Sequence, residues 1–167
     1  MSSRLSEYGV TLEPLRPDHA DAVLAFELEN RAYFAEWIWD RGDEYFAEFP
    51  VRHAAQLAEQ EAGICRFHVL VDGEGAVVGR VNLIDLADGQ AELGYRIAEK
   101  WAGRGLATAA VRAIVELAPG YGLTSLRAGA SDRNPASQAV LTRVGFRQVG
   151  VSSTDLGPGK KYVLEAL

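Results

Sequence analysis

The sequence from Ala91 to Thr108 is AELGYRIAEKWAGRGLAT, a strand-like run followed by a glycine-rich turn and the start of a helix. Apolar and polar residues alternate over 91–97, as in a half-buried strand. Gly103 and Gly105 let successive backbone N–H groups turn toward one anion at the positive end of a helix dipole, where Arg104 adds a full charge. The segment therefore predicts a phosphate or pyrophosphate site between a strand and a helix.

Two well-known phosphate loops do not match this segment. A Walker loop needs a Gly-Lys-Ser/Thr tripeptide, and the chain contains none. A Rossmann loop follows a parallel first strand, and an acidic residue about 20 positions on binds the ribose. Here the loop follows the third strand of a predicted meander, and no acid ends the next predicted strand, 126–130.

The hydrophobic pattern predicts an alternation of strands and helices along the rest of the chain. We expect strands at 10–13, 65–71, 76–86, 91–97, 126–130, 146–151 and 161–164, and helices at 20–30, 53–62, 105–118 and 135–144. Short turns join the three strands between 65 and 97, which indicates an antiparallel meander. The order strand, helix, strand around 105–118 indicates a parallel pair with a right-handed crossover. The last two strands are expected to flank a loop that contains Gly157-Pro158-Gly159.

Length and composition are typical of one ordinary globular unit, and we expect a single domain over 1–167. Hydrophobic residues make up 48% of the chain, enough for a sizeable core. A net charge of −6 disfavours nucleic acid as the main ligand. Cys65 has no second cysteine to pair with, and the chain shows no signal peptide and no apolar run near the ~18 residues of a membrane span. These features predict a cytoplasmic protein without a membrane partner.

Two segments at this spacing resemble motifs of the GCN5-related N-acetyltransferases (GNAT). The first is 91–108, which looks like the acetyl-CoA motif of that family. The second, Asn134-Pro135-Ala136-Ser137 continued by VLTRVGF over 140–146, is similar to the N-x-x-S…G-F segment of the RimJ/RimL branch, the ribosomal-protein N-terminal acetyltransferases. The resemblance covers nearly the whole chain. It implies an α/β fold whose mixed, mostly antiparallel sheet has about seven strands, a splayed parallel pair formed by the fourth and fifth strands, and about four helices.

The resemblance also implies acetyl-CoA as cosubstrate. The pantetheine arm would pair with the backbone of the strand at Tyr95, Arg96 and Ile97. The pyrophosphate would lie on the loop and first helical turn, at Gly103, Arg104, Gly105, Leu106, Ala107 and Thr108. Asn134 matches a position whose side chain bonds the pantetheine arm, although the same residue is also a good helix N-cap before Pro135.

The chain departs from the family pattern at two positions. Ala102 stands where the family motif begins with Gln or Arg, so a phosphate contact from that side chain is absent. Leu141 stands where many relatives carry a tyrosine that protonates the departing thiolate, which excludes a tyrosine acid at that position. Ser137 is the candidate for a hydrogen bond to the coenzyme sulfur, to stabilise charge or relay a proton; alternatively it faces the helix interior.

Direct acetyl transfer from a thioester to an amine needs an unprotonated amine, an oriented carbonyl and a stabilised oxyanion, and it needs no metal. A backbone N–H near Tyr95 would polarise the acetyl oxygen. Glu92 is the candidate base, acting directly or through water, because it lies on the strand expected to hold the acetyl group. An ion pair with Arg96 or a neighbouring strand is the alternative for Glu92. Lesser candidates for the base are Glu29, Asp85 and Asp155.

The cysteine and the histidines do not suggest a reactive or metal site. Cys65 lies within a predicted strand and is expected to be a small buried hydrophobe. His19, His53 and His68 fall in different elements without ligand spacing. We therefore expect structural roles for all four residues and no metal.

The segment 33–49 interleaves seven aromatic residues with five acids, and we expect it to cover the acceptor. Carboxylates attract a cationic amine, and aromatic faces bind cations and extended peptides. Phe34, Glu36 and Trp37 are the predicted acceptor-binding residues. The alternative is a pair of core-packing helices with a solvated acidic side.

The sequence thus predicts an acetyl-CoA-dependent N-acetyltransferase that acts on a primary amine, above all the N-terminal amine of a protein or peptide. A small-molecule amine is the first alternative: a polyamine, an aminoglycoside or an amino-acid derivative. A non-catalytic acyl-CoA-binding sensor is the second. The width of the acceptor cleft distinguishes a peptide from a small amine, and a homodimer is left open.

Overall fold

A seven-stranded mixed sheet organises the structure, a computed structural model that describes residues 4–154 and 157–167. The strands are β1 Thr11–Pro14, β2 Arg66–Val71, β3 Val77–Ala87, β4 Gln90–Ile97, β5 Ser125–Ser131, β6 Arg147–Thr154 and β7 Gly157–Glu165. They lie in the order β1-β2-β3-β4-β5-β7-β6, and β4 and β5 form the parallel pair. The predicted fold class, including the meander β2-β3-β4, is confirmed.

The described residues form six α-helices, where about four were expected. They are α1 Ala20–Glu29, α2 Arg31–Phe34, α3 Asp43–Ala47, α4 Phe49–Glu61, α5 Leu106–Leu117 and α6 Pro135–Val144. The two short helices α2 and α3 lie in the aromatic segment, where aromatic side chains hide the helical period. Helix α4 starts before the predicted His53 because Pro50 is tolerated in a first helical turn.

The prediction of a loop at Gly157-Pro158-Gly159 is wrong, because these residues begin β7. Pro158 pairs in register with Ser153, and Gly159 with Ser152. A proline near the start of a strand is compatible with pairing, since the missing N–H is not needed there.

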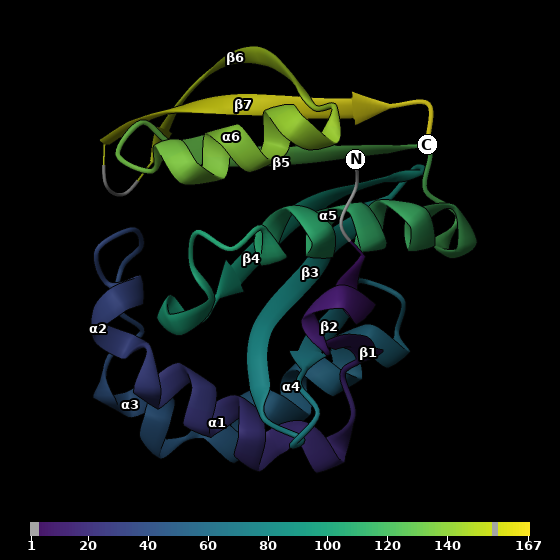
Figure 1. Cartoon of the computed structure of the whole chain (residues 1–167). Helices are drawn as coiled ribbons and strands as arrows, with labels where there is room; N and C mark the ends of the chain where they lie inside the picture. The colour runs from purple at the N-terminus through teal and green to yellow at the C-terminus, as the bar shows by residue number, and fades with distance from the viewer. Residues whose placement is uncertain (1–3, 155–156) are drawn as a thin grey trace.

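Helices cover both faces of the sheet (Figure 1). Helices α5 and α6 pack on one face in a core that contains Leu70, Val81 and Leu126. On the other face, α1–α4 pack over β2 in a second core that contains Phe26 and Val69. Strands β2 and β3 are therefore buried on both faces, which explains their nearly continuous hydrophobic runs. No helix in the described ranges is long and apolar enough to cross a membrane.

The parallel pair β4/β5 comes apart partway along its length. Its register contains only Gln90↔Ser125, Ala91↔Leu126 and Glu92↔Arg127. Strand β4 stays paired with β3 up to Ile97, and β5 stays paired with β7 up to Ser131. Residues 93–97 therefore leave one backbone edge without a strand partner, and this is the predicted splay.

A buried carboxylate holds α1 to the sheet. The Glu27 side chain on α1 is only 2% exposed, and its oxygens lie 3.0 Å from Arg80 of β3 and 2.8 Å from Arg96 of β4. Arg41, in the segment between α2 and α3, approaches the same carboxylate at 3.8 Å. Since buried charges need partners, Glu27 ties the helices to the strand that lines the splay.

Replacing Glu27 with alanine is expected to lower the free energy of unfolding by about 3–5 kcal/mol, because Arg80 and Arg96 would remain buried without their anion. Urea unfolding measures this change. Glu29→Ala on the same helix is the matched control. That carboxylate is 64% exposed and lies 4.0 Å from Lys100, so its loss should cost no more than about 0.5 kcal/mol. Equal losses for the two variants would contradict the structural role of Glu27.

Candidate functional site

Two cavities lie at the opening between β4 and β5. The first, which we name the helix-side cavity, has a volume of about 470 Å³. It lies among β4, α5, α6 and α2 and is lined by Tyr33, Phe34, Trp37, Tyr95, Arg96, Ile97, Trp101, Ala102, Gly103, Gly105, Leu106, Ala107, Thr108, Asn134, Ala136, Ser137, Ala139, Val140 and Arg143. It therefore brings together nearly all of the predicted cofactor residues.

The second, the strand-side cavity, has a volume of about 670 Å³. It is lined by Trp37, Ile38, Ile84, Glu92, Leu93, Gly94, Arg127, Ala128, Gly129, Ala130, Ser131, Val149, Ser152, Lys161, Tyr162 and Val163. Strand β4 contributes to both cavities, with Gly94 in the strand-side cavity and Tyr95 in the helix-side cavity, and Trp37 borders both. The opening of the splay thus separates two compartments that meet at one strand.

The glycine-rich loop takes the conformation that an anion site requires. Gly103 and Gly105 have φ angles of +74° and +88°, and Gly105 is the N-cap of α5. The first N–H groups of that helix have no partner within it and lie at the cavity. Tyr8, remote in sequence, donates a hydrogen bond of 2.9 Å to the carbonyl of Arg104 and fastens the loop from outside.

Two arginines differ from what the sequence predicts. The guanidinium of Arg104 lies over the Trp101 ring, 5.4 Å from its centroid, and Arg104 does not line the helix-side cavity. Arg143 of α6 does line that cavity. Sequence reasoning missed Arg143 and Tyr8 because only the folded chain brings these side chains to the loop.

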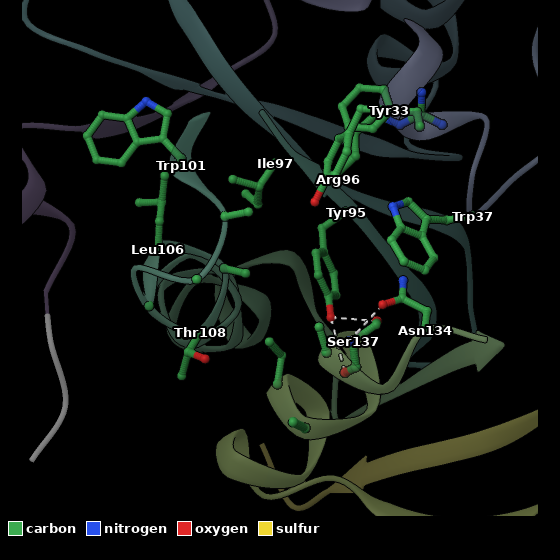
Figure 2. Close-up of a pocket in the computed structure, with 18 of the residues that line it drawn as sticks. Tyr33, Trp37, Tyr95, Arg96, Ile97, Trp101, Leu106, Thr108, Asn134 and Ser137 are labelled. Atoms are coloured by element: carbon green, nitrogen blue, oxygen red, sulfur yellow. Dashed lines mark hydrogen bonds between the residues drawn. The ribbon is translucent and has the colours of Figure 1, made fainter. Parts of the chain in front are cut away.

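Asn134 and Ser137 meet Tyr95 across the splay (Figure 2). The Oδ1 atom of Asn134 accepts a hydrogen bond from the Ser137 N–H at 3.2 Å, so Asn134 is the N-cap of α6 and its Nδ2 remains able to donate. The Ser137 Oγ lies 2.8 Å from the Tyr95 hydroxyl. Burial raises the pKa of Tyr95 to about 12, against the effect of its hydrogen bond with Ser137, so the phenol stays protonated. Ser137 lines the helix-side cavity.

The predicted acceptor residues separate in the structure. Trp37 lines both cavities, and Phe34 is buried and lines only the helix-side cavity, under the guanidinium of Arg96. Glu36 is exposed and lines neither cavity. Of the predicted acceptor residues, only Trp37 lies where it can contact both compartments.

The acids of the aromatic segment are largely engaged with arginines of the same region. Arg31 pairs with Asp40 at 2.7 Å and with Asp43 at 2.9 Å. The hydrogen bond from Arg31 lowers the pKa of Asp40 to about 2. Glu48 approaches Arg52 at 3.9 Å. No acidic residue of the segment 33–49 is among the residues that line the strand-side cavity.

Glu92 lies in the strand-side cavity, beside the point where β4 and β5 separate. Arg96, its suggested partner, pairs with Glu27 instead. Within residues 4–154 and 157–167, the Glu92 side chain makes no hydrogen bond or ion pair, so it is available as a base. Glu29 and Asp85 line neither cavity. Asp155, the remaining candidate base, lies outside the described residues.

The cysteine and histidines lie away from both cavities. Cys65 is buried, and burial raises the pKa of its thiol. His68 bonds the Tyr121 hydroxyl at 2.7 Å, and burial lowers its pKa to about 4. In the described part of the chain, no group of three or more His, Cys, Asp or Glu side chains could hold a metal ion.

Known proteins resemble this chain in sequence and in fold. "Probable N-acetyltransferase YjcK" of Bacillus subtilis (strain 168) is 26% identical over 150 residues, which cover 86% of this chain and 83% of the relative. "Putative ribosomal N-acetyltransferase YdaF" of the same organism is 27% identical over 158 residues, covering 84% and 79%.

Solved structures match over almost the entire chain. The ribosomal-protein-S5-alanine acetyltransferase from Vibrio fischeri superposes with a TM-score of 0.88 at 18% identity, covering 95% of this chain and 93% of that one. The spermidine N-acetyltransferase from Vibrio cholerae, in complex with CoA and spermine, gives 0.79 at 17% identity, covering 95% and 96%. These likenesses show the fold.

The family model of the acetyltransferase (GNAT) domain matches residues 10–147, well over half of the chain. This match agrees with the motif at 91–108 and with the splayed pair β4/β5. We conclude that the chain belongs to the GNAT acetyltransferase family and is an acyltransferase that uses acetyl-CoA.

Proposed function

We propose that this enzyme transfers the acetyl group directly to the N-terminal amine of a protein or peptide in the cytoplasm. The breadth of the strand-side cavity carries this proposal. The cavity is lined from β4 across β5 and β7 to β6, three steps of about 4.8 Å between neighbouring strands. About 14 Å of groove accommodates roughly four extended residues. A relative named as a ribosomal N-acetyltransferase, 27% identical, supports the same class of acceptor.

The helix-side cavity fits acetyl-CoA, which supplies the acyl thioester. The amides of Gly103, Gly105 and the first turn of α5 would bind its pyrophosphate, and Arg143 adds a cation beside them. The unpaired backbone edge at 95–97 would hold the pantetheine arm, and Nδ2 of Asn134 would donate to it. The edge of β4 at 95–97 has no partner strand that would compete with the arm. Asn134 caps α6 with its Oδ1 atom, which leaves Nδ2 for the arm.

The catalytic roles divide between the two faces of β4. Glu92 would take the proton from the acceptor ammonium in the strand-side cavity. A backbone N–H near Tyr95 would polarise the acetyl oxygen. On the other face, Ser137 Oγ would donate a hydrogen bond to the coenzyme sulfur while accepting one from the Tyr95 hydroxyl, 2.8 Å away. The role of Tyr95 is to orient the serine, because its hydroxyl lies within hydrogen-bond distance of Ser137 Oγ.

A small-molecule amine is the alternative acceptor, and the open carboxylate of Glu92 would suit it equally well. Against a polyamine stands the charge of the strand-side cavity, whose lining includes Arg127 and Lys161. The aromatic segment does not compensate for this, since its Asp40 and Asp43 pair with Arg31.

The proposed acceptor is tested with a thiol-release assay on peptides with free and blocked N-termini, beside spermidine and an aminoglycoside. We expect turnover only with free N-terminal amines of peptides. Glu92→Gln should lower kcat and move the acidic limb of the pH–rate profile toward the pKa of the acceptor's own amine, with the affinity for acetyl-CoA unchanged. Turnover of spermidine without turnover of any peptide would refute the proposed acceptor. A Glu92→Gln enzyme with normal kcat and an unchanged pH profile would refute the role of Glu92 as base.

Ser137→Ala is expected to lower kcat by roughly 100-fold at an unchanged KM for acetyl-CoA, because the sulfur loses its hydrogen-bond donor. Tyr95→Phe should act in the same direction and cost little more in the Ser137→Ala background. Steady-state kinetics of the two single variants and the double variant measure this coupling. Thr142→Ala is the control, since this hydroxyl lies on the same helix and bonds the carbonyl of Gln138. Additive effects would mean that Tyr95 acts independently of Ser137.

Gly105→Ala is expected to weaken acetyl-CoA binding by on the order of tenfold through the strain of a positive φ, and further through a clash. A Cβ atom on Gly105 would lie 2.7 Å from the Tyr8 hydroxyl, whereas one on Gly103 would meet nothing within 4 Å. Gly103→Ala is therefore the control for strain alone. The difference between the two variants should shrink in a Tyr8→Phe background, as measured by calorimetric titration with CoA. An undiminished difference would exclude Tyr8 as its cause.

A further inference from the structure

The strand-side cavity contains more positive than negative charge. Its charged lining residues are Glu92, Arg127 and Lys161. This balance is opposite to the net charge of the whole chain, −6, and to the acidity of the segment 33–49. The charge of this lining therefore cannot be inferred from the overall composition of the chain.

The three charges lie on one face of three neighbouring strands. Glu92 of β4 is in register with Arg127 of β5, and Gly129 of β5 is in register with Lys161 of β7. Residues two positions apart on a strand share a face, so Arg127 and Lys161 are diagonal neighbours. Lys161 is two strands across from Glu92 and two residues along, a backbone separation of about 12 Å at the usual strand geometry. The order across the sheet is thus carboxylate, guanidinium, ammonium.

Neither cation is neutralised by an acid in the described part of the chain. The guanidinium of Arg127 donates to the neutral side chain of Gln90 at 3.1 Å, and Lys161 has no side-chain partner among these residues. Other basic residues of this part of the sheet do have acidic partners: Lys160 of β7 pairs with Asp132, and Arg147 of β6 pairs with Glu165. Arg127 and Lys161 remain available for an anion in the cavity.

We propose, on the basis of the proposed function, that the preferred acceptor carries a carboxylate a few ångströms from its reactive amine. Glu92 receives the amine, and Arg127 and Lys161 bind the carboxylate one or two strands away, about 5–12 Å from Glu92. At about 3.3–3.6 Å for each extended residue, this separation places an Asp or Glu side chain at the second or third residue of a peptide. A polyamine would instead bring its second cation against Lys161.

The test compares kcat/KM for peptides that differ only at positions two and three, carrying Asp, Asn or Lys. The kcat/KM of aspartate peptides should exceed that of asparagine peptides by roughly three- to tenfold, and that of lysine peptides should be the lowest. The preference for aspartate should fall as the salt concentration rises. Lys161→Gln and Arg127→Gln should reduce the preference, and Lys161→Glu should favour the lysine peptides. Small amines with a carboxylate, such as glutamate, form a second arm that identifies the source of the carboxylate.

Lys160→Gln is the matched control, because its side chain projects from the opposite face of β7 and pairs with Asp132. The Lys160→Gln enzyme should prefer Asp over Asn peptides as strongly as the unaltered enzyme does. Thermal melting checks that each variant is folded. Equal rates for Asp and Asn acceptors in both arms, or a Lys161→Glu enzyme with an unchanged ranking, would overturn the proposal. The two hypotheses can fail separately. Charge-dependent turnover of small carboxylate amines, without turnover of any peptide, would support the carboxylate preference and refute the peptide acceptor.

Discussion

The separation of β4 from β5 is the constraint on which the site depends. The two strands share three register pairs and then diverge, each held by its other neighbour, β3 or β7. The unpaired edge of β4 offers backbone groups that can bind an extended arm, and β4 and Trp37 line both cavities. Across this gap, the Tyr95 hydroxyl on β4 contacts Ser137 on the helix that follows β5. Sheet pairing, the proposed cofactor site and the proposed catalytic residues therefore meet at one strand.

Buried charge keeps that strand in place. Glu27 on α1 pairs with Arg80 and Arg96, and Arg96 also lies over the Phe34 ring. Because removal of one partner leaves the others buried and unpaired, these contacts resist displacement of α1 and α2 from the sheet. Trp37, which follows α2, borders both cavities, so the same network supports one wall of the strand-side cavity. These ion pairs fix the position of α1 and α2 on the sheet more than they add to the net stability of the fold.

Local pattern predicted much of the fold and part of the site. Alternation of apolar residues predicted the meander, which the structure confirms. Two glycines before a helix predicted the turn into α5, which we propose as the anion loop. Each of these signals lies within a short stretch of sequence. The short helices α2 and α3 escaped prediction, since the aromatic residues there follow no clear period. Tyr8 and Arg143 escaped it because their partners are remote in sequence. The partners of the acids in the segment 33–49 also escaped prediction: Asp40 and Asp43 pair with Arg31, which precedes that segment.

The sequence alone thus indicated the order of the strands and longer helices, the candidate phosphate-binding loop and the family motifs, since each depends on residue types at short and regular spacing. Tertiary structure decided which side chains share a compartment. It assigned Phe34 to the helix-side cavity, left Glu36 outside both cavities, and placed Glu92 beside Arg127 and near Lys161. Strand register and ion pairing are settled by contacts between distant segments, and no local spacing encodes them.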